Sequence, residues 1–291
     1  MGQVQKNKYG FYSLLNPPTE GELEKYYAKK YYQDGKGHYE AQYSEEEIRY
    51  LHNKIEQKYF LINDFLKNHS DPSLLDIGSG EGWALQFFKN KGWSVTGIDY
   101  SEHSCKKFNP EVLDNLLLGD IYKNIQNLIS GKKRFSVIWM KHVLEHVIDP
   151  LALLRDCRAL LKDNGILVIE VPNDFSVIQN YLLDNKKINQ QFWVVTPDHI
   201  SYFSKESMDR LAEDAGFQNL VTIGDYPIDF SLINTDTNYI SDPSKGKNCH
   251  LSRIEIENFM HSISVEKTNA YYKALADLGL GREVISFFKS R

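Results

Sequence analysis

The sequence has few cysteines and no long apolar run. Its three cysteines, Cys105, Cys157 and Cys249, lie far apart and form no C-x-x-C pair, which argues against a disulfide framework and a cysteine zinc site. No apolar stretch approaches the length needed to span a bilayer. Residues 1–8 are polar, unlike a secretion signal. These absences predict a cytoplasmic protein that does not enter a membrane.

An excess of positive charge is also missing, because the net charge is −5 at pH 7. A protein that grips nucleic-acid phosphates needs the opposite balance, so no nucleic-acid partner is expected. Tyrosine is abundant, with 18 residues, and its apolar ring with a polar tip suits a pocket for a hydroxylated ligand. The expected partner is therefore a small-molecule substrate, and the composition leaves a homo-oligomer open.

Apolar runs of strand length alternate with helical stretches in the middle of the chain. A helix (205–215) and a strand (220–223) follow them, and a strand pattern ends the chain (282–289). Such alternation predicts an α/β fold with a parallel sheet covered by helices on both faces. The alternating strands are expected at 74–77, 94–98, 116–118, 135–140 and 166–171, and the helices between them at 83–91, 101–109, 121–129 and 149–161.

The chain divides into four segments by pattern. Residues 1–72 form an N-terminal cap that contains an amphipathic helix (44–67), and residues 73–224 form the ligand-binding core. Residues 225–281 are an insertion with helices at 251–263 and 265–278, which we interpret as a lid or an oligomerisation element. Residues 282–291 supply the last strand of the core.

The strongest motif is the loop that follows the first core strand, Leu74-Leu-Asp-Ile-Gly-Ser-Gly-Glu-Gly82. Its glycines let the backbone turn tightly and approach a ligand before the next helix begins. A dinucleotide fingerprint would need a third glycine at Trp83, so a nicotinamide-dependent oxidoreductase is disfavoured. Asp76 lies inside the strand, where it would repel a pyrophosphate but attract the ammonium group of a methionine moiety.

Two further acids follow neighbouring strands. Asp99 ends the second strand, where an acid can accept hydrogen bonds from both ribose hydroxyls of an adenosine. Asp120 follows the third strand and could accept the adenine amine while Ile121 packs on the ring.

These motifs resemble those of the class I S-adenosylmethionine-dependent methyltransferases. The run His142-Val-Leu-Glu-His146, together with Pro197–Ser204, is similar to the branch that holds quinone and sugar methyltransferases. The resemblance implies a Rossmann-like, seven-stranded, mostly parallel sheet with a reversed last strand, and S-adenosylmethionine as cofactor. The cofactor residues it implies are Asp76, Gly78, Ser79, Gly80, Gly82, Asp99, Tyr100, Asp120, Ile121 and Lys141.

His142, Glu145 and His146 are spaced so that one helical turn would bring them together. A zinc peptidase of the inverted type is disfavoured, because the motif begins at a strand end and Asp149-Pro150 soon ends any helix. In a methyltransferase the end of the fourth strand faces the transferred methyl, so His142 is the candidate general base. In related quinone enzymes the matching trio is implicated in cation binding, but its first member there is an acid. Magnesium prefers oxygen ligands, so no metal is expected. Glu145 and His146 are catalytic candidates too, or they only brace the loop.

The acceptor side of the site is predicted from aromatic and imidazole groups. His199 is a candidate second base, and Trp193 and Tyr202 are candidate substrate contacts, as are Tyr26 and Tyr31 in the cap. A hydroxyl or carbon nucleophile needs a base, which favours methyl transfer to oxygen or carbon of a sugar, nucleotide sugar or glycan precursor. The alternatives are a quinone-like or secondary-metabolite hydroxyl, or a non-catalytic module that binds adenosylmethionine or adenosylhomocysteine.

Overall fold

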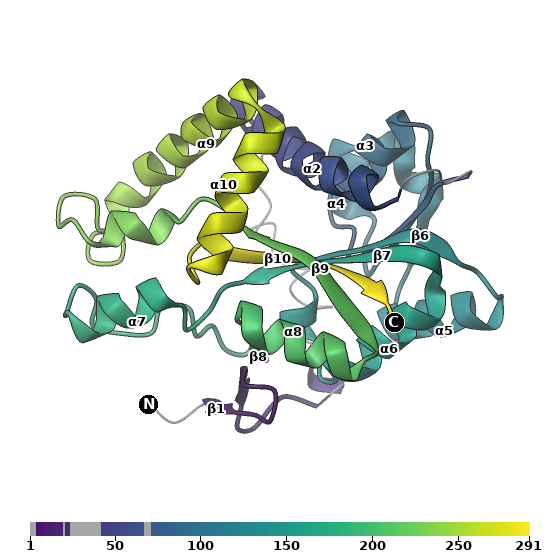
Figure 1. The fold of residues 1–291 in the computed structure, drawn as a ribbon, viewed down its shortest axis with the longest axis horizontal. Helices are drawn as coiled ribbons and strands as arrows, with labels where there is room; N and C mark the ends of the chain where they lie inside the picture. The colour runs from purple at the N-terminus through teal and green to yellow at the C-terminus, as the bar shows by residue number, and fades with distance from the viewer. Residues whose placement is uncertain (1–3, 20, 24–41, 67–70) are drawn as a thin grey trace.

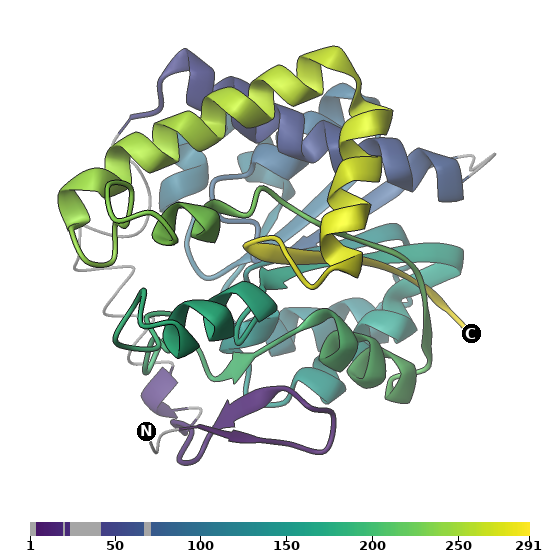
Figure 2. The same ribbon diagram turned by 60° about the vertical axis from the view of Figure 1, so that its left-hand side comes forward.

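A seven-stranded sheet runs through the centre of the protein, with helices on both faces (Figures 1 and 2). The computed structural model describes residues 4–19, 21–23, 42–66 and 71–291. The strand order is β5-β4-β3-β6-β7-β10-β9, and β10 runs antiparallel to both of its neighbours. The predicted α/β fold with a reversed last strand is confirmed. Its strands are β3 (Ser73–Ile77), β4 (Ser94–Asp99), β5 (Leu116–Leu118), β6 (Phe135–Lys141), β7 (Leu161–Pro172), β9 (Phe217–Gly224) and β10 (Glu283–Ser290).

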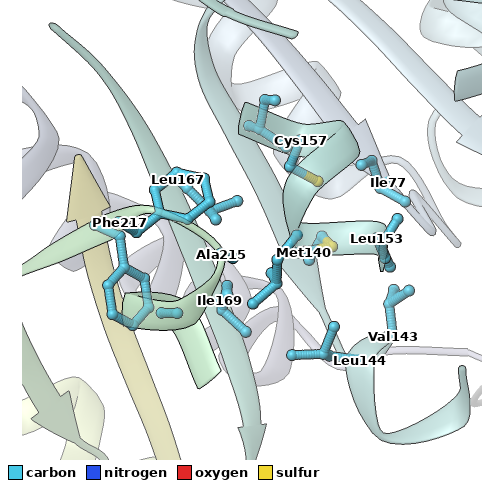
Figure 3. Close-up of a cluster of buried hydrophobic side chains, with 14 of the residues drawn as sticks. Ile77, Met140, Val143, Leu144, Leu153, Cys157, Leu167, Ile169, Ala215 and Phe217 are labelled. Carbon is cyan, nitrogen blue, oxygen red and sulfur yellow. The ribbon is translucent and has the colours of Figure 1, made fainter. Parts of the chain in front are cut away.

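The central strands are apolar on both faces, and alternate side chains enter two separate cores. On β7, Leu167 and Ile169 join one buried cluster, whereas Ile166 and Val168 join the other. This division follows from the two-residue period of a strand. Figure 3 shows the first cluster, which contains Met140 and Ile169 from the strands together with Leu153 and Cys157 from a covering helix.

The helices divide between these two faces. The first core is covered by α5 (Ile121–Ser130), α6 (Pro150–Leu160) and α8 (Lys205–Asp214). The second is covered by α2 (Glu45–Phe65), α3 (Trp83–Asn90), the short α4 (His103–Phe108) and α10 (Val265–Asp277). The helix expected at 101–109 spans only His103–Phe108, and a 3₁₀ turn begins at Pro110. Among the helices of the described ranges, none combines the length and apolar character that crossing a membrane requires.

The N-terminal segment contains two short strands ahead of the expected helix. β1 (Val4–Lys6) and β2 (Tyr12–Leu14) form an antiparallel hairpin, and β2 also pairs with β8 (Ser201–Tyr202). These strands are too short to show a period in the sequence, and their partner lies far along the chain. Phe11 anchors the hairpin, with its ring centroid 4.5 Å from that of Phe203 in the first core.

The segment between β9 and β10 packs on α2 rather than standing away from the core. It contains the 3₁₀ turns η3 (Ile228–Leu232) and η4 (Pro243–Lys245), then α9 (Gly246–Ile263) and α10. Lys54 of α2 forms a buried ion pair with Glu257 of α9 at 2.8 Å, and Asn53 bonds Asn258 at 2.9 Å. An additional helix, α7 (Val177–Asp184), follows β7 and was not expected.

Candidate active site

The glycine loop joins β3 to α3 in a conformation that only glycine adopts easily. Gly78, Gly80 and Gly82 all have positive φ, at 73°, 52° and 81°. A Cβ on Gly78 would lie 2.5 Å from Cγ2 of Val143, and one on Gly82 would lie 2.8 Å from Sγ of Cys105. The loop therefore needs glycine at these positions, because of the positive φ angles and because Val143 and Cys105 leave no room for a Cβ on Gly78 and Gly82.

Asp99 links the end of β4 to this loop. One carboxylate oxygen accepts from the Gly80 N–H at 2.7 Å, and the other accepts from the Ser101 N–H at 3.1 Å. A carboxylate has more lone pairs than these two bonds use, so Asp99 can still accept from a diol. Burial raises the pKa of Asp99, while the backbone bonds act in the opposite direction.

Asp76 is an almost fully buried acid within β3, 4% exposed. Burial raises its pKa to about 7, the negative charge of Asp99 adds to the rise, and Lys141 opposes it. A bound ammonium group would restore the charged form. The nearby Ser79 hydroxyl is buried and makes no hydrogen bond to any described residue, so it too has capacity for a ligand.

Asp120 and Tyr100 lie at the ends of β5 and β4. Asp120 is the N-cap of α5: one oxygen accepts from the Lys123 N–H at 2.7 Å, and the other lies 3.3 Å from the Tyr100 hydroxyl, which donates to it. Ile121 begins the helix at this point. The helix cap thus uses only part of the acceptor capacity of Asp120.

The structure separates His142 from Glu145 and His146, which corrects the predicted helical turn. β6 ends at Lys141, His142 takes a positive φ of 54°, and only the 3₁₀ turn η2 (Leu144–His146) follows. The ring of His142 instead reaches β10, where Nε2 lies 3.0 Å from Oε2 of Glu283. Its neighbour Lys141 lies 3.7 Å from Glu170 of β7.

The ion pair changes the protonation of His142. Burial would lower its pKa, but the charge of Glu283 and the hydrogen bond to it outweigh burial and raise the pKa to about 9. The same pairing holds the pKa of Glu283 well below its ordinary value. His142 is therefore cationic at neutral pH before a ligand binds, whereas the sequence predicts a histidine that titrates near pH 6.5.

Glu145 and His146 lie beside His199 instead. Glu145 is 1% exposed, and neither of its carboxylate oxygens has a hydrogen-bond partner among the described residues; burial raises its pKa. His146 and His199 are in edge contact, with ring centroids 5.0 Å apart. One ligand atom from each of the three residues lies within 4.8 Å of the others, a spacing that also suits a cation with a preference for nitrogen.

Of the remaining residues predicted to contact the acceptor, two are buried and two lie outside the described residues. Tyr202 is buried in β8 and donates to the carbonyl of His199 at 3.0 Å, so it supports the His199 loop rather than lining open space. Trp193 is 1% exposed, and its Nε1 has no partner within the described part of the chain. Tyr26 and Tyr31 lie outside the described residues.

Comparison with known proteins places this arrangement in a family. A family model described as a methyltransferase domain matches residues 49–222, more than half of the chain. A crystal structure of a SAM-dependent methyltransferase from Archaeoglobus fulgidus has the same fold, with a TM-score of 0.51 and 23% identity over 83% of this chain and 94% of that chain. The chain belongs to the S-adenosylmethionine-dependent methyltransferases.

Relatives from several bacteria are named ubiquinone biosynthesis O-methyltransferase. The protein from Pelagibacter ubique is 30% identical over 169 residues, which cover 55% of this methyltransferase and 70% of that protein. The protein from Actinobacillus pleuropneumoniae is 31% identical over 106 residues, or 34% of this chain. This methyltransferase spans 45% of the length of the Actinobacillus protein.

The residues of this methyltransferase fit its cofactor along one edge of the sheet. Parallel strands place their carboxyl ends together, so Asp76, Asp99 and Asp120 follow one another from β3 to β5. The buried acid of β3 can pair with the methionine ammonium, and the orphaned Ser79 hydroxyl lies in the same loop. S-adenosylmethionine supplies an electrophilic methyl group on a sulfonium.

Sequence reasoning missed several charged groups of the methyltransferase site. Glu283 begins β10, and Arg282, the residue before it, bonds Asp174, which follows β7, at 3.1 Å. Burial raises the pKa of Asp174 to about 6, against the effect of Arg282. The position of Asp174 just after a parallel strand was a usable signal, whereas nothing near Glu283 in the sequence indicates its contact with His142.

Proposed function

We propose that this methyltransferase moves the methyl group of S-adenosylmethionine to a hydroxyl oxygen of a small polyhydroxylated acceptor, a sugar or a nucleotide-linked sugar. The observation that supports this acceptor class is a group of buried polar atoms without partners among the described residues, beyond the ends of β6 and β7. They are both carboxylate oxygens of Glu145, Oδ2 of Asp174 and Nδ1 of His199. Leaving such an atom unpaired costs about 1–3 kcal/mol, which a hydroxyl-rich ligand would recover.

The protonation states of these groups favour hydrogen bonding to hydroxyls. Burial and the nearby His146 lower the pKa of His199 to about 3, so its ring is neutral and can accept a hydrogen bond. A hydroxyl is a weak nucleophile that must lose its proton during the attack, and a positioned base contributes roughly 10²–10⁴-fold to such a step. His142 is the base that we assign to this role.

A second acceptor class is a phenolic hydroxyl, as the names of these relatives suggest. The family model, however, matches residues 49–222 and leaves out the β1–β2 hairpin and the segment between β9 and β10. The hairpin pairs with β8, two residues after His199, and the second segment begins at Asp225, which accepts a hydrogen bond from the backbone of Glu283. The similarity to these relatives therefore supports methyl transfer more strongly than it supports a phenolic acceptor.

Labelled S-adenosylmethionine offered with a panel of nucleotide sugars and a panel of catechols tests the proposal. We expect methylation of a nucleotide sugar; turnover of catechols alone would replace the sugar proposal with the phenol one. No turnover of either panel, with adenosylhomocysteine still bound, would contradict both.

The variant Glu145→Gln probes the orphaned carboxylate in the same assay. We expect kcat/KM for the sugar to fall about 5- to 150-fold, the equivalent of about 1–3 kcal/mol, with adenosylhomocysteine affinity unchanged. Asp209→Asn is the matched control. Asp209 belongs to α8, outside the site, and its Oδ1 accepts a hydrogen bond of 2.6 Å from the side chain of Asn219. Equal effects of the two variants would remove Glu145 from acceptor binding.

A further inference from the structure

Glu283 is held rigidly at the start of β10. Its backbone N–H donates to Oδ1 of Asp225 at 2.8 Å. Glu283 also lies opposite Pro172 in the antiparallel pairing of β10 with β7. The side chain is 18% exposed and bonds Nε2 of His142, whose own side chain is 42% exposed. The carboxylate is therefore fixed by the sheet, while the imidazole it holds remains accessible to a ligand.

Side chains from β6, β7 and η2 also place charges near His142, and those of Glu170 and Lys141 form ion pairs with each other or with Lys58. Glu170 of β7 pairs with Lys58 of α2 and with Lys141. Glu145 of η2 also acts on His142 through its charge, but no hydrogen bond joins them. Glu283 is thus the carboxylate that bonds the imidazole directly.

The backbone of His142 orients its ring. His142 takes a positive φ of 54°, which is uncommon for a residue with a side chain. Here the turn directs the ring toward β10, and the His142 N–H donates to the carbonyl of Glu170 at 2.9 Å. Backbone and carboxylate together fix the ring.

We propose that Glu283 is the positioning residue for His142, accepting its Nε2–H bond so that Nδ1 takes the acceptor proton. This inference rests on the proposed function. The acceptor oxygen attacks the sulfonium methyl, the carbon–sulfur bond breaks with its electron pair on sulfur, and the hydroxyl proton moves to Nδ1. The products are the methyl ether, neutral adenosylhomocysteine and an imidazolium paired with Glu283, which returns its proton to water. Carboxylate–imidazole pairs orient bases in this way in other enzymes.

The arrangement predicts where the base form of His142 appears on the pH scale. Because the pKa of the resting pair is raised to about 9, the wild-type rate should rise with pH well above the usual histidine range. The sulfonium of bound S-adenosylmethionine is a nearby positive charge that disfavours the imidazolium. The midpoint of the pH–rate profile should therefore lie between about pH 6.5 and 9.

The experiment compares Glu283→Gln with wild type in two readouts. In NMR titrations of the free protein, His142 should titrate near pH 9 in wild type and at least one unit lower in the variant, since the paired charge is gone. In methyl transfer to the best acceptor of the panels above, the pH midpoint should also fall and the plateau rate should drop by about tenfold or more. His142→Ala marks the rate without the base.

Two further variants separate charge from structure. Glu56→Gln is the matched control, because Glu56 also holds a histidine, His261, at 3.0 Å, between α2 and α9; neither readout should move. Glu283→Asp keeps the charge on a shorter side chain, so His142 should keep a raised pKa with a partial loss of rate, which tests the proposal even if the Gln variant unfolds.

The positioning role would be overturned if the pKa of His142 measured by NMR were the same in Glu283→Gln as in wild type. It would also be overturned if that pKa shifted but the pH midpoint of methyl transfer did not. A failure of every acceptor would contradict the proposed function instead, and the NMR titration would still decide whether Glu283 controls His142.

Discussion

Gly78 offers a direct test of how the glycine loop is held. The change Gly78→Ala places a Cβ 2.5 Å from Cγ2 of Val143 at a φ of +73°. A positive φ costs a residue with a Cβ about 1–2 kcal/mol, and forcing extra volume into a packed core costs about 1–3 kcal/mol. The expected loss in the free energy of unfolding is therefore about 2–5 kcal/mol.

Gly92→Ala separates these two contributions. Gly92 has a similar φ of +82°, but a Cβ there meets nothing within 4 Å, so its variant should lose only about 1–2 kcal/mol. Adding Val143→Ala to Gly78→Ala removes the atom that the new Cβ strikes. The double variant should then be more stable than the sum of the single effects predicts, by about 1–3 kcal/mol.

Urea unfolding of wild type, the three single variants and the double variant gives these free energies. Adenosylhomocysteine affinity, measured in parallel by calorimetry, should fall in Gly78→Ala and recover in part in the double variant, because the loop returns toward its original position. Equal losses in Gly78→Ala and Gly92→Ala, or strict additivity with Val143→Ala, would refute the claim that close packing against Val143 shapes the loop.

Two other predictions concern the acids of the cofactor edge. Asp99→Ala should weaken adenosylhomocysteine binding about 10- to 150-fold, equivalent to about 1.5–3 kcal/mol, since a charged acceptor is lost; an unchanged dissociation constant in calorimetry would exclude Asp99 from the ribose site. Adenosylhomocysteine affinity should fall as pH drops below about 7, because the raised pKa of Asp76 makes it neutral there and a neutral acid cannot pair with an ammonium. Asp76→Asn should abolish this slope, and a slope that persists would assign it to another group.

The positions of the glycine loop and of Asp99 in the fold could be predicted from the sequence because their determinants are local. The glycine loop begins directly after β3 and Asp99 is the last residue of β4. Parallel strands bring such positions to one edge whatever the details of packing. The amphipathic pattern likewise predicted a helix at 44–67, and α2 spans Glu45–Phe65 with Ser44 as its N-cap.

The acceptor side could not be predicted because its contacts join distant parts of the chain. One residue with a positive φ, His142, breaks the expected turn and sends its ring to Glu283, 141 positions later. The β2–β8 pairing is similarly non-local. Such contacts depend on the strand order of the sheet, in which the last strand lies between β7 and β9, and a periodic pattern carries no information about which strands become neighbours.

The place of β10 within the sheet also has a consequence for biosynthesis. β7 and β9 share no ladder with each other and are joined only through β10, which follows every other strand in the chain. A nascent polypeptide that has not yet released residues 283–290 from the ribosome therefore leaves the edge of β7 and both edges of β9 unpaired, whereas the complete sheet exposes only the outer edge of β9 on this side. Such edges recruit strands from other molecules, so a product truncated before β10 should depend on chaperones and precipitate without them.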